Sequence, residues 1–132
     1  DALEAEGIPY DPALVYEGEF QIASGEQALP YLLGKKVTAI FAFNDMIAYG
    51  VYKQARGYNL SIPADLSVVG FDDLAFSDLI DPPLTTLEYP VKRMAEAVVD
   101  RILAKINREP VSEEPIVFDP VLKVKGSTSR RR

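Results

Sequence analysis

Polar side chains follow two strongly apolar segments of the sequence, and their types suit ligand binding. Asn44 and Asp45 end the first of these segments, and Asp72 and Asp73 end the second. An amide both donates and accepts hydrogen bonds, and a carboxylate is a strong acceptor, so the set suits a ligand with several hydroxyl groups. A simpler interpretation stays open for all four, because Asn and Asp also cap the first turn of helices.

Two aromatic residues stand close to these positions in the expected architecture. Phe20 lies in a loop ahead of a helical segment, and Tyr89 directly follows the short apolar segment 84–88. An aromatic face can cover the apolar side of a sugar ring or stack on a base. Either residue also suits an ordinary core or surface position. The residues alone therefore predict a polar pocket with an aromatic wall, and they name no ligand.

Enzyme chemistry has little support in the composition. The chain contains no His and no Cys, so the usual general base and the strongest nucleophile are both missing. Its glycines are isolated, which excludes a Gly-rich phosphate loop. The adjacent carboxylates of Asp72 and Asp73 keep a Mg²⁺-dependent enzyme as an alternative, because hard cations prefer oxygen ligands. We otherwise expect no catalysis, no cofactor and no metal.

The charge balance of the 132 residues is acidic, with 14 Lys and Arg against 20 Asp and Glu, a net charge of −6. This argues against a nucleic-acid surface within the chain, because phosphate binding needs clustered basic residues. The one dense basic run, 130–132, is interpreted as a disordered tail. The absence of cysteine fits the cytoplasm, although a cysteine-free periplasmic protein would look the same. No segment resembles a membrane helix or a signal peptide.

The order of the segments alternates between strands and helices, which predicts a parallel sheet covered by helices. Ligands bind such sheets beyond the carboxyl ends of the strands, where Asn44, Asp72 and Tyr89 are placed. The runs 37–43 and 66–71 are apolar throughout and are expected to be buried on both faces. Strands are expected at 13–16, 37–43, 66–71, 84–88, 116–118 and 121–124, and helices at 1–6, 22–33, 45–56, 74–79 and 90–107. Pro30 is expected to kink or shorten its helix.

The helix at 90–107 has the clearest pattern in the sequence. Its apolar residues follow the helical repeat without a miss, at Val91, Met94, Ala95, Val98, Val99, Ile102, Leu103 and Ile106. At ~1.5–3 kcal/mol for each large buried side chain, this stripe is predicted to be a major stabiliser.

Several motifs, in order, resemble the lac repressor family. They are GEF at 18–20, SG at 24–25, AIFAFNDM at 39–46, VVGFDD at 68–73, PPLTT at 82–86 and GST at 126–128. The resemblance implies a periplasmic-binding-protein-like sensor with two α/β lobes and an effector in the cleft between them. Residues 1–129 would form its carboxyl-terminal portion, with 90–113 crossing to the first lobe. A DNA-binding amino-terminal domain would lie outside this chain.

The resemblance also assigns roles within the pocket. Phe20 would form its aromatic wall, Asn44 and Asp72 would hydrogen-bond the effector, and Tyr89 would add a polar contact. A sugar or a nucleoside is the expected effector. The function implied is that of an effector-sensing module of a transcriptional repressor that binds operator DNA. A solute-binding protein of a sugar transport system is the alternative.

The resemblance further implies a homodimer formed through this part of the sensor. The helix after Asn44 is apolar nearly all round and needs cover on two sides, which the sheet and a second subunit would supply. Tyr49 and Tyr52 from this helix, together with Phe76 and Leu79, are the expected interface residues. Burial of both groups by the part of the protein that is missing from this chain is the alternative.

Overall fold

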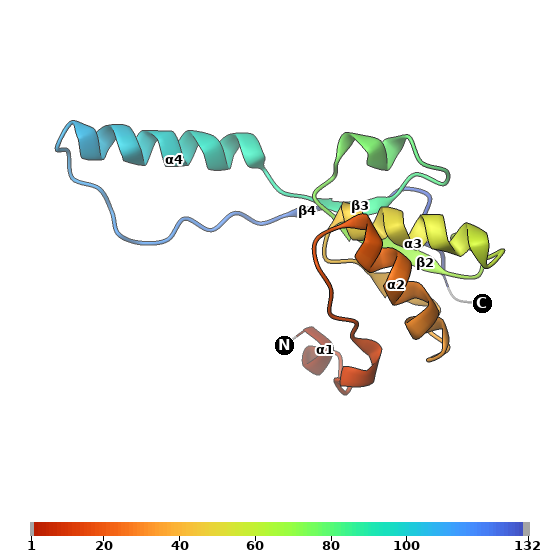
Figure 1. Cartoon of the computed structure of the whole chain (residues 1–132). Coiled ribbons are helices and arrows are strands. Elements are labelled where there is room, and N and C mark those ends of the chain that lie inside the picture. The colour runs from red at the N-terminus through yellow and green to blue at the C-terminus, as the bar shows by residue number, and fades with distance from the viewer. Residues whose placement is uncertain (1, 131–132) are drawn as a thin grey trace.

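The computed structural model describes residues 2–130, which are built around a four-stranded sheet. Strands β1 (Ala39–Phe41), β2 (Ser67–Phe71) and β3 (Thr85–Glu88) run parallel in this order. Strand β4 (Val121–Lys123) pairs antiparallel with β3. The predicted α/β class with a mainly parallel sheet is therefore confirmed (Figure 1).

In the described part of the chain, four α-helices connect and flank these strands: α1 (Ala2–Ala5), α2 (Ile22–Leu33), α3 (Asp45–Gly57) and α4 (Val91–Ile106). Helix α3 packs on β2, and α2 packs on α3. Short 3-10 segments lie in the loops at Pro12–Leu14 and Ala75–Asp78. Within residues 2–130, no helix combines the length and the hydropathy that a bilayer span requires.

The contact between α2 and α3 depends on two glycines. A Cβ atom on Gly50 would lie 1.9 Å from the Ile22 carbonyl oxygen, and one on Gly25 would lie 2.0 Å from the Ile47 carbonyl oxygen. Since neither distance is possible for a real side chain, the two helix backbones touch only because both residues are glycine. Helix α2 therefore supplies the second covering layer on α3 that was expected from a partner subunit.

Tyr52 on α3 was expected at the subunit interface, and the structure places it in the core instead. Its side chain is only 5% exposed, and its hydroxyl donates to the Pro82 carbonyl oxygen at 2.9 Å. Tyr52 is therefore a core residue of this chain rather than a surface residue that is free to contact a second subunit. It belongs to a core that lies between the sheet, α3 and α2. The largest fully buried apolar side chains of that core are Leu29, Val51, Leu66, Val68 and Leu84.

Burial on both faces of the central strands was predicted and is wrong for β1 in the described residues. Ile40 is buried, whereas its neighbours Ala39 and Phe41 are exposed, Phe41 by 64%. Successive residues of a strand point to opposite faces of the sheet. Only the face that carries α3 and α2 is covered here, so every second residue of β1 stays exposed.

Residues 90–120, which we call the arm, extend away from the sheet (Figure 1). The arm consists of α4 and the chain that returns from it to β4. No residue of α4 is buried, and Val98 and Ile106 are 57% and 70% exposed. The helix itself is confirmed, but the predicted burial of its apolar stripe is wrong within this chain, because no described element packs on that face.

Smaller differences concern local structure. Residues 13–16 form no strand, because Asp11 accepts a hydrogen bond from the Ala13 N–H and starts a 3-10 turn instead. Residues 116–118 also form no strand. Pro30 does not shorten α2, which runs to Leu33 as predicted. Of the basic tail, Arg130 is exposed, and 131–132 lie outside the described residues.

Candidate ligand-binding pocket

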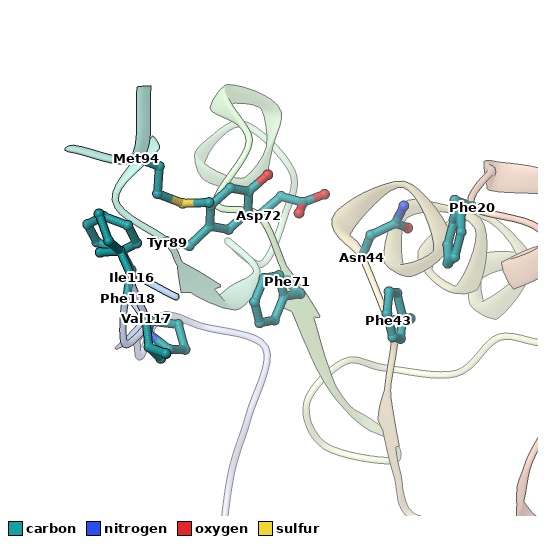
Figure 2. A pocket seen from close by; sticks show the side chains of 11 residues that line it. Phe20, Phe43, Asn44, Phe71, Asp72, Tyr89, Met94, Ile116, Val117 and Phe118 are labelled. Carbon is teal, nitrogen blue, oxygen red and sulfur yellow. The ribbon is translucent and has the colours of Figure 1, made fainter. Parts of the chain in front are cut away.

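The four residues expected to bind a ligand line one pocket of about 760 Å³ (Figure 2). Asn44, Asp72 and Tyr89 follow the carboxyl ends of β1, β2 and β3, and Phe20 comes from the loop ahead of α2. Parallel strands bring their carboxyl ends to the same edge of the sheet, which explains this convergence. The roles of these residues toward a ligand remain predictions. The lining also includes Phe43, Phe71, Met94, Ile116, Val117 and Phe118.

Asn44 can cap a helix and face the pocket at the same time. It is the N-cap of α3, where its Oδ1 accepts the Ile47 N–H at 2.9 Å. The capping interpretation is therefore confirmed. The cap uses the side-chain oxygen and leaves the amide nitrogen to donate toward the pocket that Asn44 lines. Capping also fixes the side-chain rotamer, so a ligand would meet a donor that is already positioned.

Asp72 places a carboxylate at the pocket in an unusual backbone conformation. Its φ angle is 125°, a region that residues other than glycine rarely adopt. Its N–H donates to the Leu87 carbonyl oxygen at 2.9 Å, which extends the pairing of β2 with β3 beyond Phe71. Burial raises the pKa of Asp72, and the nearby charge of Asp45 raises it further. Backbone strain and desolvation at one residue are typical of functional positions.

Asp45 was considered both as a ligand-binding residue and as a helix cap, and the structure gives it a different role. Its side chain is fully buried. Its Oδ2 accepts from the Leu74 N–H at 2.9 Å and from Ser77 Oγ at 2.5 Å, and its Oδ1 accepts from Thr86 Oγ1 at 2.6 Å. Asp45 thus ties the start of α3 to the segment after Asp72 and to β3. Sequence reasoning missed this role, because the donors are distant in sequence.

Asp73 forms an ion pair and does not line the pocket. Lys125 Nζ lies 2.7 Å from Oδ1 of Asp73 and 2.7 Å from Oδ1 of Asp78. Burial lowers the pKa of Lys125, but its hydrogen bonds to these two carboxylates outweigh that effect and raise it. Asp72 and Asp73 therefore have different environments. Within residues 2–130, no three His, Cys, Asp or Glu side chains gather as a metal site.

Aromatic side chains line the pocket more densely than the sequence suggested. Phe20 and Phe43 have ring centroids 5.2 Å apart, and Phe71 stacks on Tyr89 at 5.6 Å with an interplanar angle of 27°. The first pair lies beside Asn44 and the second beside Asp72 (Figure 2). Phe43 and Phe71 directly precede the two polar residues, so the strand-end argument had the information to find them.

Met94 and Phe118 reach the pocket from the arm. Their contribution has no local signal in the sequence, because it depends on where α4 leaves β3 and where the chain returns. Arg93, next to Met94, has its guanidinium 5.6 Å from the centre of the Phe118 ring. The two sides of the arm therefore meet at its base, where they line the pocket.

The remaining residues expected at a dimer interface lie near the segment after Asp72. Phe76 and Leu79 are 66% and 76% exposed. Tyr49 is half-buried, its hydroxyl lies 2.8 Å from Ser77 Oγ, and burial raises its pKa. Burial also raises the pKa of Tyr52, to about 12. Phe76 and Leu79 are thus available to a partner, whereas Tyr52 is not.

The sequence matches the family model of the periplasmic binding protein-like domain over residues 1–128. A similar curated protein is the HTH-type transcriptional regulator MalR of Streptomyces coelicolor, with 39% identity over 127 residues. The match covers 96% of this chain and 36% of MalR. This chain therefore spans less than two fifths of that relative.

Solved structures agree with the family match. A LacI family regulator from Enterococcus faecium with bound ribose has a TM-score of 0.91 and 27% identity, covering 99% of this chain and 49% of that one. A complex of the transcriptional regulator CelR with cellobiose has a TM-score of 0.89 and 30% identity, covering 96% of this chain and 39% of that one.

The fold, the strand-end pocket and these matches define a class. This chain belongs to the family of periplasmic binding protein-like domains. Within it, the relatives are regulators of the lac repressor family, and the match covers the carboxyl-terminal part of their sensor domain, which confirms the resemblance found in the sequence.

Proposed function

We propose that this chain is the carboxyl-terminal part of the effector-sensing and dimerisation domain of a cytoplasmic, DNA-binding transcriptional repressor. The observation that carries the proposal is the pocket at the sheet edge, where Asn44 and Asp72 lie between aromatic side chains. The relatives support it, because those reported are transcriptional regulators, two of them in complex with sugars. No observation favours a solute-binding protein of a transport system.

The pocket can act as a sensor through simple hydrogen-bond chemistry. Hydroxyl groups of a sugar or nucleoside donate to the Asp72 carboxylate and accept from the Asn44 amide, while the aromatic rings cover the apolar faces of the ligand. Binding favours whichever arrangement of the two lobes holds the ligand best. The difference in affinity between the arrangements then limits how far operator binding shifts.

The arm supports the proposed division of the chain. Residues 1–129 belong to the sensor, and 90–113 cross to its first lobe. An amphipathic helix with a fully exposed apolar stripe needs a covering surface, and α4 has none among residues 2–130. The first lobe would provide that surface. The amino-terminal domain that contacts operator DNA would lie outside this chain, whose net charge of −6 disfavours a DNA surface of its own.

Dimerisation is proposed through the surface that carries Phe76 and Leu79. Both side chains are exposed on the segment that Asp45 and Lys125 hold against the sheet edge. A second copy of the protein would bury them. Analytical ultracentrifugation of the full-length protein tests this, because replacing both residues by Ser should convert dimers to monomers.

The sensing function is tested by titrating the full-length protein with sugars and nucleosides while following both heat and operator release. At least one compound should bind and change operator affinity. Asp72→Ala should abolish that response while the protein still unfolds cooperatively. If no small molecule changes operator affinity, the sensing proposal fails. A folded Asp72→Ala protein that responds normally would exclude a role for this carboxylate.

A further inference from the structure

The segment that carries Phe76 and Leu79, residues 73–79, is held to the rest of the chain mainly by polar contacts. Its 3-10 turn, Ala75–Asp78, has one buried residue, and that residue is Ser77. The large apolar side chains of Phe76 and Leu79 are exposed instead. A segment of this kind depends on hydrogen bonds and ion pairs for its position, because little apolar packing fixes it.

The middle of the segment is tied to α3 and to the start of β3. Asp45 Oδ2 accepts from the Leu74 N–H at 2.9 Å and from Ser77 Oγ at 2.5 Å. The Leu84 N–H donates to the Ser77 carbonyl oxygen at 2.8 Å. These contacts use groups inside the segment, so the carboxylates near its two ends are held by a different partner.

That partner is Lys125, which bridges both ends of the segment. Its Nζ lies 2.7 Å from Oδ1 of Asp73 and 2.7 Å from Oδ1 of Asp78. Lys125 is 52 residues from Asp73 in the sequence, and its side chain is only 16% exposed. Ion pairs at such a position are screened less by water than pairs on the open surface. One cation thus fixes the distance between two carboxylates on either side of the apolar residues.

The backbone around Lys125 is itself fixed to the sheet. The Lys125 N–H donates to Thr85 Oγ1 at 2.9 Å. Ser127 Oγ accepts from the Thr85 N–H at 2.7 Å and donates to the Val68 carbonyl oxygen at 2.6 Å. The lysine side chain therefore extends from a backbone that is already positioned, and its ammonium group holds the segment at a defined place relative to the sheet.

Lys123 offers a comparison two residues earlier in the chain. Its Nζ also lies 2.7 Å from a carboxylate oxygen, Oε2 of Glu88, and both side chains are over 40% exposed. Glu88 belongs to β3, so this ion pair joins β4 to its neighbouring strand and does not include residues 73–79. The two lysines carry the same charge but hold different parts of the molecule.

Building on the proposed dimerisation through Phe76 and Leu79, we propose that Lys125 is a positioning residue of the dimer interface. By bridging Asp73 and Asp78, it holds the segment between them in the conformation that a second copy of the protein meets. A surface that is fixed before association loses little conformational freedom when the partner binds, and this favours tight association. Without the lysine, the two carboxylates repel each other, and the apolar side chains between them are no longer presented in one arrangement.

Sedimentation of the full-length protein over a range of concentrations tests this role. Lys125→Met removes the cation and keeps a long side chain, and it should raise the dimer dissociation constant about tenfold. Lys123→Met is the matched control and should change it by less than about twofold. Lys125→Arg keeps a cation with donors for both carboxylates and should restore dimerisation to near the parent level.

A second control separates positioning from a general loss of stability. Val68→Ala removes packing in the core without touching the segment, so a folded Val68→Ala protein should dimerise like the parent. Urea unfolding establishes that each variant is folded. A dimer weakened as much by Val68→Ala or by Lys123→Met as by Lys125→Met would overturn the proposed role, and so would an Arg variant as weak as the Met variant.

Asp78→Asn gives an independent variant, because the Asp78 side chain is 68% exposed and its substitution leaves the core intact. It should weaken the dimer when Lys125 is present and cause no further weakening in the Lys125→Met background, because both changes break the same contact. Additive effects would mean that Asp78 acts on the second subunit directly, and they would overturn the positioning role of Lys125.

The results also distinguish this inference from the dimerisation on which it rests. If the protein with Ser at positions 76 and 79 is monomeric while Lys125→Met dimerises like the parent, the interface stands and the role of Lys125 is wrong. If the protein with both serines remains fully dimeric, the interface itself is wrong and the inference fails with it.

Discussion

The sheet region (α2, α3 and β1–β4) and the arm contain helices with similar apolar patterns, yet they bury them very differently. In α3, Ala48, Val51 and Ala55 are at most 1% exposed, whereas Val98 of α4 is 57% exposed. Helix α3 has the sheet on one side and α2 on the other. Helix α4 leaves the sheet and meets neither (Figure 1). An amphipathic pattern therefore predicts that a helix forms and needs cover, but not where that cover comes from.

Carboxylates of the sheet region and of the arm also differ in burial, and this difference gives the largest expected effect on stability. Asp45→Ala leaves the N–H of Leu74 and the hydroxyls of Ser77 and Thr86 without their acceptor. Buried donors that lose their acceptor cost about 1–3 kcal/mol each, so we expect the free energy of unfolding to fall by about 3 kcal/mol or more. Urea unfolding of the full-length protein and of the variant measures this loss of stability.

Asp119→Ala in the arm is the matched control for Asp45→Ala. Asp119 is exposed, and substitution of such a residue should change stability by less than about 0.5 kcal/mol. Equal effects of the two substitutions would contradict the role assigned to the buried carboxylate.

Close helix packing in the sheet region provides the next test. Gly50→Ala places a Cβ atom 1.9 Å from the Ile22 carbonyl oxygen, so α2 and α3 must separate. We expect a loss of about 2–3 kcal/mol in the free energy of unfolding, the upper part of the usual range of about 1–3 kcal/mol for overpacking. Gly57→Ala, at the end of the same helix, has nothing within 4 Å of the added atom. It should be neutral or slightly stabilising when both variants are compared by thermal unfolding, and a comparable loss at Gly57 would exclude the backbone contact as the cause.

The two regions are compared most directly by truncating one valine in each. Val68 is fully buried in β2 and Val98 lies on the stripe of α4. In the 132-residue chain, Val68→Ala should lower the free energy of unfolding by about 2 kcal/mol, because it leaves a cavity. Val98→Ala should change it by less than about 0.5 kcal/mol. A loss at Val98 as large as that at Val68 would mean that α4 is covered in solution and that the contrast between the two regions is wrong.

Asp72 gives the smallest expected change in stability and the clearest dependence on pH. Burial and the charge of Asp45 raise the pKa of its carboxyl above the ordinary 3.8, so the folded protein holds this proton more tightly than the unfolded chain does. Through this group, stability rises as the pH falls through the raised folded-state pKa toward 3.8, and it is lowered by ionisation at neutral pH.

Asp72→Asn removes the charge and should therefore stabilise the protein slightly at neutral pH while weakening effector binding about tenfold or more, as expected for loss of a charged hydrogen bond. Thermal unfolding at several pH values, with effector titration of the same samples, measures both effects. A variant that is less stable than the parent at pH 7 would contradict the destabilising effect of this charge.

The sequence by itself determined most of the secondary structure and the position of the pocket. Apolar runs that alternate with helical segments indicated the parallel strands, although the expected burial on both faces was wrong for β1. Asn44, Asp72 and Tyr89 came together as expected, since parallel strands end at one edge. Tertiary structure alone decided what covers each surface. It gave Asp45 its three distant donors, brought Met94 and Phe118 to the pocket, buried Tyr52 and left α4 exposed. A residue pattern records which side chains avoid water, but the element that shields them is often distant in the chain.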